Sequence, residues 1–328
     1  KILLSGGAGY IGSHTTLALL DQGHQVTVID NLSTGNKNLI PENAKFIECD
    51  IEDKLTVANL LKAEKFDALM HFAGFIQVEE SVNNPNKYFM NNTENSKILF
   101  ETCQNNNLKN IIFSSTAAAY GNPIDEKPIK EDALLKPLNP YGESKILTEK
   151  YLQSNSQLKF IILRYFNVAG ADPKLRSGLI SKKATHLIKI ASEVAVGKRD
   201  NITIFGDDYS TPDGTAVRDY IHVSDLADIH VKAAEHLINN QQSKIINCGY
   251  GKGFSVKDVL KKVDEVNQKS IKFKIGNRRS GDSAMLVSDT SKLNSLFDWK
   301  PRHNDLSFII KTAIDWEKKL LNNSRAQT

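Results

Sequence analysis

Residues 1–12 read Lys1-Ile2-Leu3-Leu4-Ser5-Gly6-Gly7-Ala8-Gly9-Tyr10-Ile11-Gly12, and they decide the fold of this 328-residue chain. The apolar residues before the glycines predict a short buried strand, and those after them predict a helix that ends near Gly23. Residues 25–30 predict a second strand, which ends in the carboxylate of Asp30. A strand, a glycine turn, a helix, a second strand and an acid in this order are typical of a dinucleotide-binding site.

The glycines fit two spacings of such a site. Gly7, Gly9 and Gly12 match G-x-G-x-x-G, while Gly6, Gly9 and Gly12 match a G-x-x-G-x-x-G variant. Small residues let the backbone approach a pyrophosphate, whose charge the helix N-terminus stabilises. Asp30 could bind the hydroxyls of the adenosine ribose, would repel a 2′-phosphate and has no arginine beside it, so we expect NAD rather than NADP. The alternative is a glycine turn that only packs a helix against a strand.

The composition bounds the class of protein. Charged residues make up 24% of the chain and hydrophobic ones 40%, as in globular proteins of one large or two unequal domains. The net charge of +4 comes from scattered lysines without interleaved aromatics, so we expect anionic small ligands and no nucleic acid. No apolar stretch reaches the roughly 20 residues of a membrane helix, and no signal peptide precedes the first strand. We therefore expect a cytoplasmic protein without a membrane partner.

The three cysteines, Cys49, Cys103 and Cys248, lie far apart and form no C-x-x-C pair. This pattern favours neither a disulfide framework nor a zinc site, and we expect no metal. Cys49 and Cys248 lie in apolar runs and are expected to be buried.

Strand-like and helical segments alternate through the first half of the chain. Further strands are predicted at residues 45–49, 67–72, 110–115 and 160–165, and helices at residues 54–64, 86–106 and 141–154. This alternation predicts an α/β fold with a doubly wound parallel (Rossmann-type) sheet and helices on both faces.

The rhythm changes near Ala171, where the loops become longer and more polar. Helices are predicted at residues 184–196, 224–237 and 256–267, the last with Ser255 as its N-cap, and a strand at residues 244–248. We predict a cofactor-binding Rossmann domain from residues 1–170 and 223–249, and a smaller α/β substrate-binding lobe from residues 171–222 and 250–328.

Tyr141 and Lys145 lie four residues apart, on one face of a predicted helix that Asn139-Pro140 begins. A free phenol has a pKa of about 10, and a nearby ammonium stabilises the phenolate and lowers that value. The pair could therefore act as a proton acceptor. Thr116 ends a strand at the expected ligand-binding edge of the sheet, where its hydroxyl could bond a substrate oxygen beside Tyr141.

Together, the glycine turn, Thr116 and the Tyr141/Lys145 pair resemble the extended short-chain dehydrogenase/reductase family. Five further segments resemble, more narrowly, the UDP-glucose 4-epimerases and their UDP-N-acetylglucosamine-accepting relatives. These segments are His71-Phe72-Ala73-Gly74, Asn91-Asn92-Thr93, Leu163-Arg164-Tyr165-Phe166-Asn167, Arg218-Asp219-Tyr220-Ile221-His222-Val223 and Arg278-Arg279-Ser280-Gly281-Asp282. The resemblance extends from Ile2 to about Trp316.

The resemblance implies an NAD-dependent isomerase that acts on UDP-sugars as a homodimer, with Tyr141, Lys145 and Thr116 as catalytic residues. It implies cofactor-binding roles for Gly6, Gly9, Tyr10, Ile11, Gly12, Asp30, Asn31, Asp50, Ile51, Phe72, Ala73, Gly74, Asn92, Lys145 and Tyr165. It implies nucleotide-sugar-binding roles for Asn167, Leu187, Phe205, Arg218, Arg279, Asp282 and Leu286. These types suit the ligand, because arginines fork onto a diphosphate, a phenylalanine can border uracil and an aspartate accepts from ribose.

The implied reaction is epimerisation at sugar C4. The Tyr141 phenolate would take the 4-hydroxyl proton while a hydride passes from C4 to NAD, and the 4-keto sugar would turn over before the hydride returns. Some relatives carry a tyrosine where this chain has Leu286, and the smaller leucine leaves room for an N-acetyl group. The resemblance therefore implies turnover of UDP-GlcNAc and UDP-GalNAc as well as UDP-glucose and UDP-galactose.

Three alternatives remain open. The enzyme could be restricted to sugars without an acetyl group, with Leu286 merely packed in the core. A 4,6-dehydratase is disfavoured, because Ala117-Ala118 follows Thr116 where those relatives have two acids. The third is a redox sensor that binds NAD without turnover, although such a protein could dispense with Tyr141 and Lys145.

Overall fold

Parallel strands form the larger sheet of the computed structural model, which describes residues 1–123, 127–181, 184–279 and 281–325. Within these residues the sheet has seven strands in the order β10-β6-β5-β4-β1-β2-β3. Their bounds are β1 (Ile2–Ser5), β2 (Val26–Asp30), β3 (Lys45–Glu48), β4 (Ala68–His71), β5 (Asn110–Thr116), β6 (Lys159–Tyr165) and β10 (Lys244–Cys248). The predicted Rossmann-type sheet is confirmed, and each predicted strand lies within two residues of its expected bounds.

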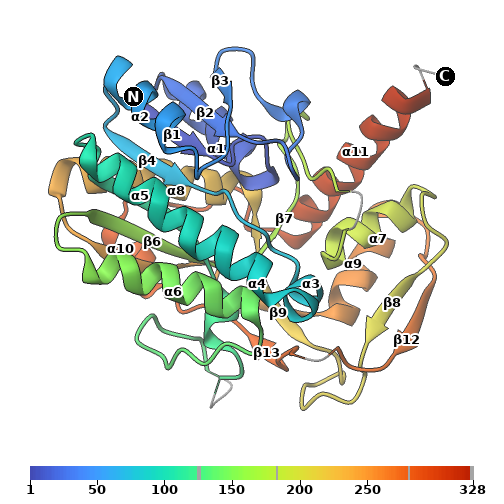
Figure 1. The fold of residues 1–328 in the computed structure, drawn as a ribbon. Coiled ribbons are helices and arrows are strands. Elements are labelled where there is room, and N and C mark those ends of the chain that lie inside the picture. The colour runs from blue at the N-terminus through green and yellow to red at the C-terminus, as the bar shows by residue number, and fades with distance from the viewer. Residues whose placement is uncertain (124–126, 182–183, 280, 326–328) are drawn as a thin grey trace.

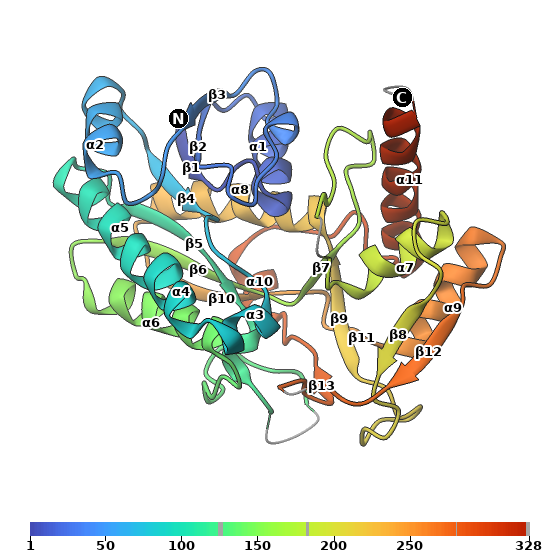
Figure 2. The same cartoon turned by 45° about the vertical axis from the view of Figure 1, so that its right-hand side comes forward.

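Helices cover both faces of this sheet (Figures 1 and 2). Alternate strand residues point to opposite faces, so Leu4 packs toward one helical layer and Leu3 toward the other. The first layer contains α1 (Tyr10–Asp21), α8 (Val223–Asn240) and α10 (Ser291–Leu296). The second contains α2 (Lys54–Ala63), α5 (Asn95–Asn105) and α6 (Pro140–Ser154). Cys49 and Cys248 are buried, as predicted.

The helix predicted over residues 86–106 is interrupted. The chain forms α3 (Val78–Asn83), α4 (Pro85–Tyr88), a π-helix η2 (Phe89–Glu94) and only then α5. Short 3-10 helices lie at η1 (Lys37–Leu39) and η3 (Ala117–Tyr120). The π-helix matters for the site because it carries Asn92, and wider π turns often occur at functional positions.

The second lobe has smaller sheets and its own core (right-hand side of Figure 2). One sheet runs β11 (Gly253–Ser255), β9 (Val217–His222), β13 (Met285–Leu286), and β7 (Asn167–Ala169) also pairs with β9. β8 (Ile202–Phe205) pairs with β12 (Phe273–Gly276). The helices are α7 (Leu187–Ala195), α9 (Val256–Asn267) and α11 (Leu306–Arg325). Ser255 caps α9, as predicted, and forms a capping box with Asp258.

The chain passes between the two lobes more than once. After β9 it re-enters the large sheet through α8 and β10. Leu293 and Trp299 then pack in the core of the large sheet, although both lie in the segment that we assign to the smaller lobe. The residue limits of the two domains stay a prediction. Among the described residues, every helix is too short or too polar to cross a bilayer.

Candidate active site

The glycine turn lies at the carboxyl end of β1 and is closely packed. Gly6 has φ +77°, and a Cβ there would lie only 2.4 Å from the backbone nitrogen of Ala73. A Cβ on Gly12 would lie 2.3 Å from the Gly6 carbonyl oxygen. No side chain caps α1 at Gly9, and its first turn contains no acid. The turn therefore fits a pyrophosphate, since the N-terminus of α1 has no side-chain cap and can stabilise a negative charge.

Asp30 ends β2 beside this turn. Its carboxylate accepts hydrogen bonds from the backbone nitrogens of Ala8, at 2.9 Å, and Leu32, at 2.8 Å. Burial raises the pKa of Asp30, and these two bonds oppose the shift. Asn31 donates to the Asp50 carboxylate at 2.7 Å. The residues expected around the adenosine thus lie together, and Ile51 is buried beneath them in the core.

The segment after β4 lies at the other end of the predicted cofactor site. A Cβ on Gly74 would lie 3.2 Å from Asn92 Oδ1 and 3.3 Å from Lys145 Nζ, so these three residues meet. Asn92 accepts from the Phe75 nitrogen at 2.8 Å and donates to the Phe75 carbonyl at 2.9 Å. It also donates to Ser144 on α6 at 3.2 Å. Asn92 therefore holds the Gly74 loop against α6, whereas the sequence predicts a direct cofactor contact.

Two of the predicted cofactor residues make aromatic contacts with α8. The Phe72 ring lies 4.8 Å from the His230 ring. The Tyr165 hydroxyl is hydrogen-bonded to His230 Nε2. Because His230 Nδ1 lies 2.8 Å from the Leu226 carbonyl, Nδ1 carries the proton and Nε2 accepts from Tyr165. The Tyr165 hydroxyl is thus engaged within the protein, and Tyr165 packs in the core of the large sheet.

The predicted catalytic residues converge at the carboxyl end of β5. Asn139 caps α6 by accepting from the Gly142 nitrogen at 2.9 Å, which sets Tyr141 in the first turn. Thr116 ends β5, and its hydroxyl lies beside the Tyr141 phenol. Lys145 is buried one turn later and donates to the Ser114 carbonyl at 2.9 Å.

Burial has the largest influence on the electrostatics of this group. It raises the pKa of Tyr141, and the Thr116 hydroxyl lowers it. Burial lowers the pKa of Lys145 to about 8, opposed by the charge of Glu149. The prediction that Lys145 lowers the pKa of Tyr141 stays a prediction. The Lys145 ammonium donates to the Ser114 carbonyl, and the loss of solvent around the phenol is the largest influence on the pKa of Tyr141.

Most of the predicted nucleotide-sugar residues lie in the second lobe. The Arg279 guanidinium lies 3.8 Å from the centre of the Phe205 ring, at the end of β8. Arg218 on β9 lies 4.0 Å from the Asp282 carboxylate. Leu286 pairs with Arg218 across β13 and β9. Ser280, between Arg279 and Asp282, falls outside the described residues.

Leu286 joins this group to the catalytic residues. It packs against a buried cluster of Ala117, Tyr120, Ile129 and Phe166, and Ala117 directly follows Thr116. The structure therefore brings the sugar-side residue of the second lobe to the end of β5.

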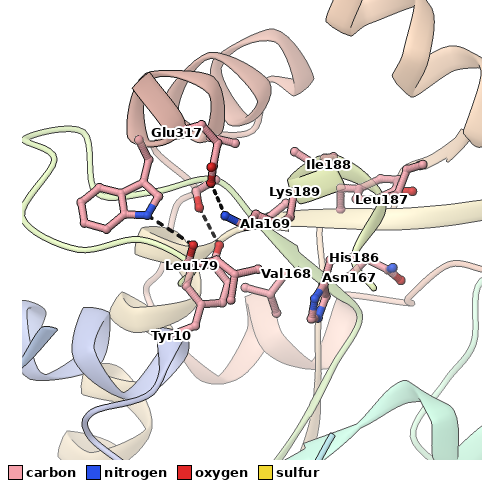
Figure 3. A pocket seen from close by; sticks show the side chains of 14 residues that line it. Tyr10, Asn167, Val168, Ala169, Leu179, His186, Leu187, Ile188, Lys189 and Glu317 are labelled. Atoms are coloured by element: carbon pink, nitrogen blue, oxygen red, sulfur yellow. Dashed lines mark hydrogen bonds and ion pairs between the residues drawn. The ribbon is translucent and has the colours of Figure 1, made fainter. Parts of the chain in front are cut away.

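Three further predicted residues, Tyr10, Asn167 and Leu187, line a cavity of about 30 Å³ between β7 and α7 (Figure 3). Asn167 and Leu187 lie on its wall with Tyr10, whose hydroxyl donates to the Gly170 carbonyl at 2.6 Å. Ile11 follows Tyr10 in the first turn of α1. His186 also lines the cavity, and its Nδ1 has no hydrogen-bond partner among the described residues.

Several residues at the site were missed by the sequence reasoning. Tyr88 is buried, and its ring lies 6.4 Å from that of Tyr141. Glu149 and Arg164 form a buried ion pair behind the catalytic group. For Glu149 a signal existed, because it follows Lys145 at helical spacing. Arg164 belongs to the segment 163–167 that carries the family resemblance, although no role was predicted for it, and Tyr88 carries no comparable signal.

The fold and the site define a Rossmann-type enzyme with a tyrosine–lysine pair beside its dinucleotide turn. The model of the NAD dependent epimerase/dehydratase family matches residues 2–249, and the chain belongs to this family, with NAD as its cofactor. It is similar to UDP-glucose 4-epimerase from Azospirillum brasilense, at 45% identity over 323 residues, covering 98% of this chain and 92% of that protein.

Solved structures of similar proteins agree with this family assignment. The chain is similar to the UDP-Glc/GlcNAc 4-epimerase of Campylobacter jejuni, at 48% identity and a TM-score of 0.84, covering 97% of this chain and 99% of that one. It is also similar to UDP-glucose 4-epimerase from Brucella ovis in complex with NAD, at 38% identity and a TM-score of 0.92, covering 96% and 97% of the two chains.

Proposed function

We propose that the chain is a UDP-hexose 4-epimerase that interconverts UDP-glucose and UDP-galactose, and also UDP-GlcNAc and UDP-GalNAc. The observation that carries the proposal is the convergence of three residues at the end of β5: the Thr116 hydroxyl beside the Tyr141 phenol, with the buried Lys145 one helical turn away. The glycine turn and Asp30 belong to the same edge of the sheet, so a bound dinucleotide and the phenol would share one site.

In this proposal Tyr141 moves one proton at the sugar 4-oxygen. Bound NAD would supply the redox chemistry, by taking the hydrogen of sugar C4 with its electron pair and returning it to the opposite face. Tyr141 accepts the 4-hydroxyl proton as the keto group forms and gives it back as the hydroxyl is restored, so no net oxidation results. Thr116 lowers the pKa of the phenol against the effect of burial. In this proposal the Lys145 ammonium, one helical turn away, adds a positive charge that favours the phenolate during the reaction.

The second lobe would hold the UDP group. Arg218 and Arg279 are the cations that could fork onto the diphosphate, and Phe205 is the aromatic surface for uracil. The pairing of Arg218 with Leu286 in neighbouring strands supports a common site for nucleotide and sugar. A neighbour from Bifidobacterium longum was solved in complex with NAD+ and UDP, and that chain is 33% identical to this one.

Leu286 supports the acetylated substrates. Its side chain is half-buried against Tyr120 and Phe166, beside the end of β5. A leucine leaves more room for an N-acetyl group than a tyrosine would. The Campylobacter jejuni relative carries UDP-Glc and GlcNAc together in its name, which agrees with this range. The alternative is an epimerase restricted to sugars without an acetyl group.

The test is an epimerisation assay by NMR with UDP-glucose and UDP-GlcNAc as separate substrates. Turnover of both supports the proposal, and Tyr141→Phe should abolish both. Turnover of UDP-glucose alone would leave the restricted epimerase. Turnover of neither, with NAD bound, would overturn the proposed substrates and favour a redox sensor or a different nucleotide sugar.

We also propose a homodimer. Val82, Met90 and Leu147 expose apolar side chains on α3, η2 and α6, which pack together in the large lobe. Light scattering on a sizing column should give twice the mass of the chain, and a monomer at micromolar concentration would contradict this.

A further inference from the structure

A fully buried ion pair lies behind the candidate catalytic residues. Arg164 on β6 is 2% exposed and Glu149 on α6 is 0% exposed. The guanidinium binds the carboxylate with two parallel hydrogen bonds, Nε to Oε1 at 3.0 Å and Nη2 to Oε2 at 2.6 Å. Removing two charges from water is costly, and apolar residues of the same size often stabilise a fold as well. The stability of the fold alone therefore does not explain why this ion pair is buried here.

Glu149 contacts both elements that carry the catalytic group. It follows Lys145 by one turn on the same face of α6. Its Oε1 also accepts a hydrogen bond from the hydroxyl of Ser115, which directly precedes Thr116 on β5. One carboxylate thus ties the helix of Tyr141 and Lys145 to the strand end of Thr116.

Arg164 is held from its other side. Its Nη1 donates to the Tyr120 hydroxyl at 2.9 Å and to the Glu131 carbonyl at 3.0 Å. Tyr120 in turn donates to Asn247 on β10 at 2.6 Å. The guanidinium is thereby anchored, and it fixes the carboxylate of Glu149 in one orientation.

We propose that Glu149 is a positioning residue for the Tyr141–Lys145 pair, whose buried carboxylate keeps the Lys145 ammonium charged and holds α6 against the end of β5. This inference rests on the proposed function. It agrees with the two effects on the pKa of Lys145: burial lowers this pKa, and the charge of Glu149 raises it.

Other groups face Lys145 from the surrounding elements. From β4 comes His71, which stays neutral because burial and the charge of Lys145 lower its pKa to about 3. From β5 come the Ser114 carbonyl and the Phe113 ring, whose centre is 4.9 Å from Nζ. Asn92 of η2 approaches across Gly74. Tyr165 of β6 lies near Tyr141, whose charge would raise the pKa of Tyr165.

The decisive variant is Glu149→Gln, which keeps the size of the side chain and removes its charge. Loss of a nearby negative charge disfavours an ammonium and favours a phenolate, so the pKa values of Lys145 and Tyr141 should both fall, by about one unit. Both limbs of the pH profile of kcat/KM should then move toward acid.

A second readout needs no turnover. Phenolate absorbance of the NAD-loaded enzyme, titrated with pH, reports Tyr141 once the matching Tyr141→Phe titration is subtracted. An acid shift of this difference in Glu149→Gln supports the proposal. If the difference titration of Glu149→Gln is unshifted and the melting temperature is lower, Glu149 only stabilises the fold. That result would overturn the proposal. If the wild type does not epimerise, the proposed function fails separately, since this titration is independent of activity.

Two further variants keep the result interpretable. Glu149→Asp retains the charge on a shorter side chain. It should lower the stability of the fold and leave the pKa of Tyr141 unchanged. If Glu149→Gln does not fold, Glu149→Gln/Arg164→Met removes both charges together, and such neutral replacements of buried pairs are tolerated. Because that double variant also removes a positive charge, its acid shift should be smaller than the shift expected for Glu149→Gln. A shift should remain, since the charge of Glu149 is the one that acts on the pKa of Lys145, and a wild-type titration in it would contradict the proposal.

Discussion

The hydroxyl of Thr116 lies beside the phenol of Tyr141 and lowers its pKa, where the end of β5 meets the first turn of α6. Thr116 Oγ1 also accepts from the Ala118 nitrogen at 3.1 Å, so its proton is free to point at the phenol. Burial raises the pKa of Tyr141, and the Thr116 hydroxyl lowers it. A donor placed here therefore favours the phenolate that the proposed reaction needs.

The first prediction concerns this donor. Thr116→Val keeps the shape and removes the hydroxyl, and hydrogen bonds to charged groups contribute about 1.5–3 kcal/mol. We expect kcat to fall by roughly tenfold to a hundredfold. Thr116→Ser retains the donor and should keep kcat close to that of the wild type. Equal losses in both variants would show that shape, rather than the hydroxyl, matters.

The second prediction concerns alkaline pH. The folded pKa of Lys145 is lowered to about 8, so its ammonium is present below that pH and is lost as the pH rises through it. We expect kcat/KM to decline above about pH 8. Lys145→Arg stays charged at every accessible pH, so its lower activity should show no such decline. A decline at the same pH in Lys145→Arg would assign it to another group.

The third prediction separates the strain of a positive φ from the close packing of the glycine turn against the segment after β4. Gly6→Ala places a Cβ 2.4 Å from the Ala73 nitrogen and should abolish NAD binding, as measured by calorimetry. Gly23 is the matched control, because it has φ +82° and nothing lies within 4 Å of the added Cβ. Gly23→Ala should destabilise the fold by about 1–2 kcal/mol without weakening NAD binding. If both variants lost NAD binding equally, the contact of residue 6 with Ala73 would not explain the loss.

The fourth prediction concerns Leu286. Leu286→Tyr should reduce turnover of UDP-GlcNAc at least tenfold more than turnover of UDP-glucose, because a larger ring would fill the space beside the sugar 2-substituent. Core exchanges of similar volume usually cost less than about 1.5 kcal/mol, so Leu286→Met should retain both activities. The ratio of the two kcat/KM values is the measurement. If Leu286→Tyr lost activity on both substrates equally, residue 286 would not determine which sugars are accepted.

Local spacing in the sequence was enough for the architecture and for many site residues. Gly6, Gly12 and Asp30 could be predicted because a nucleotide turn depends on backbone geometry within about thirty residues. Tyr141 and Lys145 could be paired because helical periodicity places residues four apart on one face. The interruption of the helix at Phe89–Glu94 was not predicted, since Asn92 obtains its partners, Phe75 and Ser144, from distant segments.

The sequence by itself determined the doubly wound sheet, the dinucleotide turn and the phenol–amine pair, because each depends on short-range periodicity. Tertiary structure alone decided the environment of that pair. The pKa of Tyr141 is raised by burial, and Glu149 meets Arg164 and Ser115 only once α6 packs on β5 and β6. Leu286 reaches Phe166 across more than a hundred residues of chain. Desolvation and contacts between distant segments are properties of the packed molecule, and no local pattern encodes them.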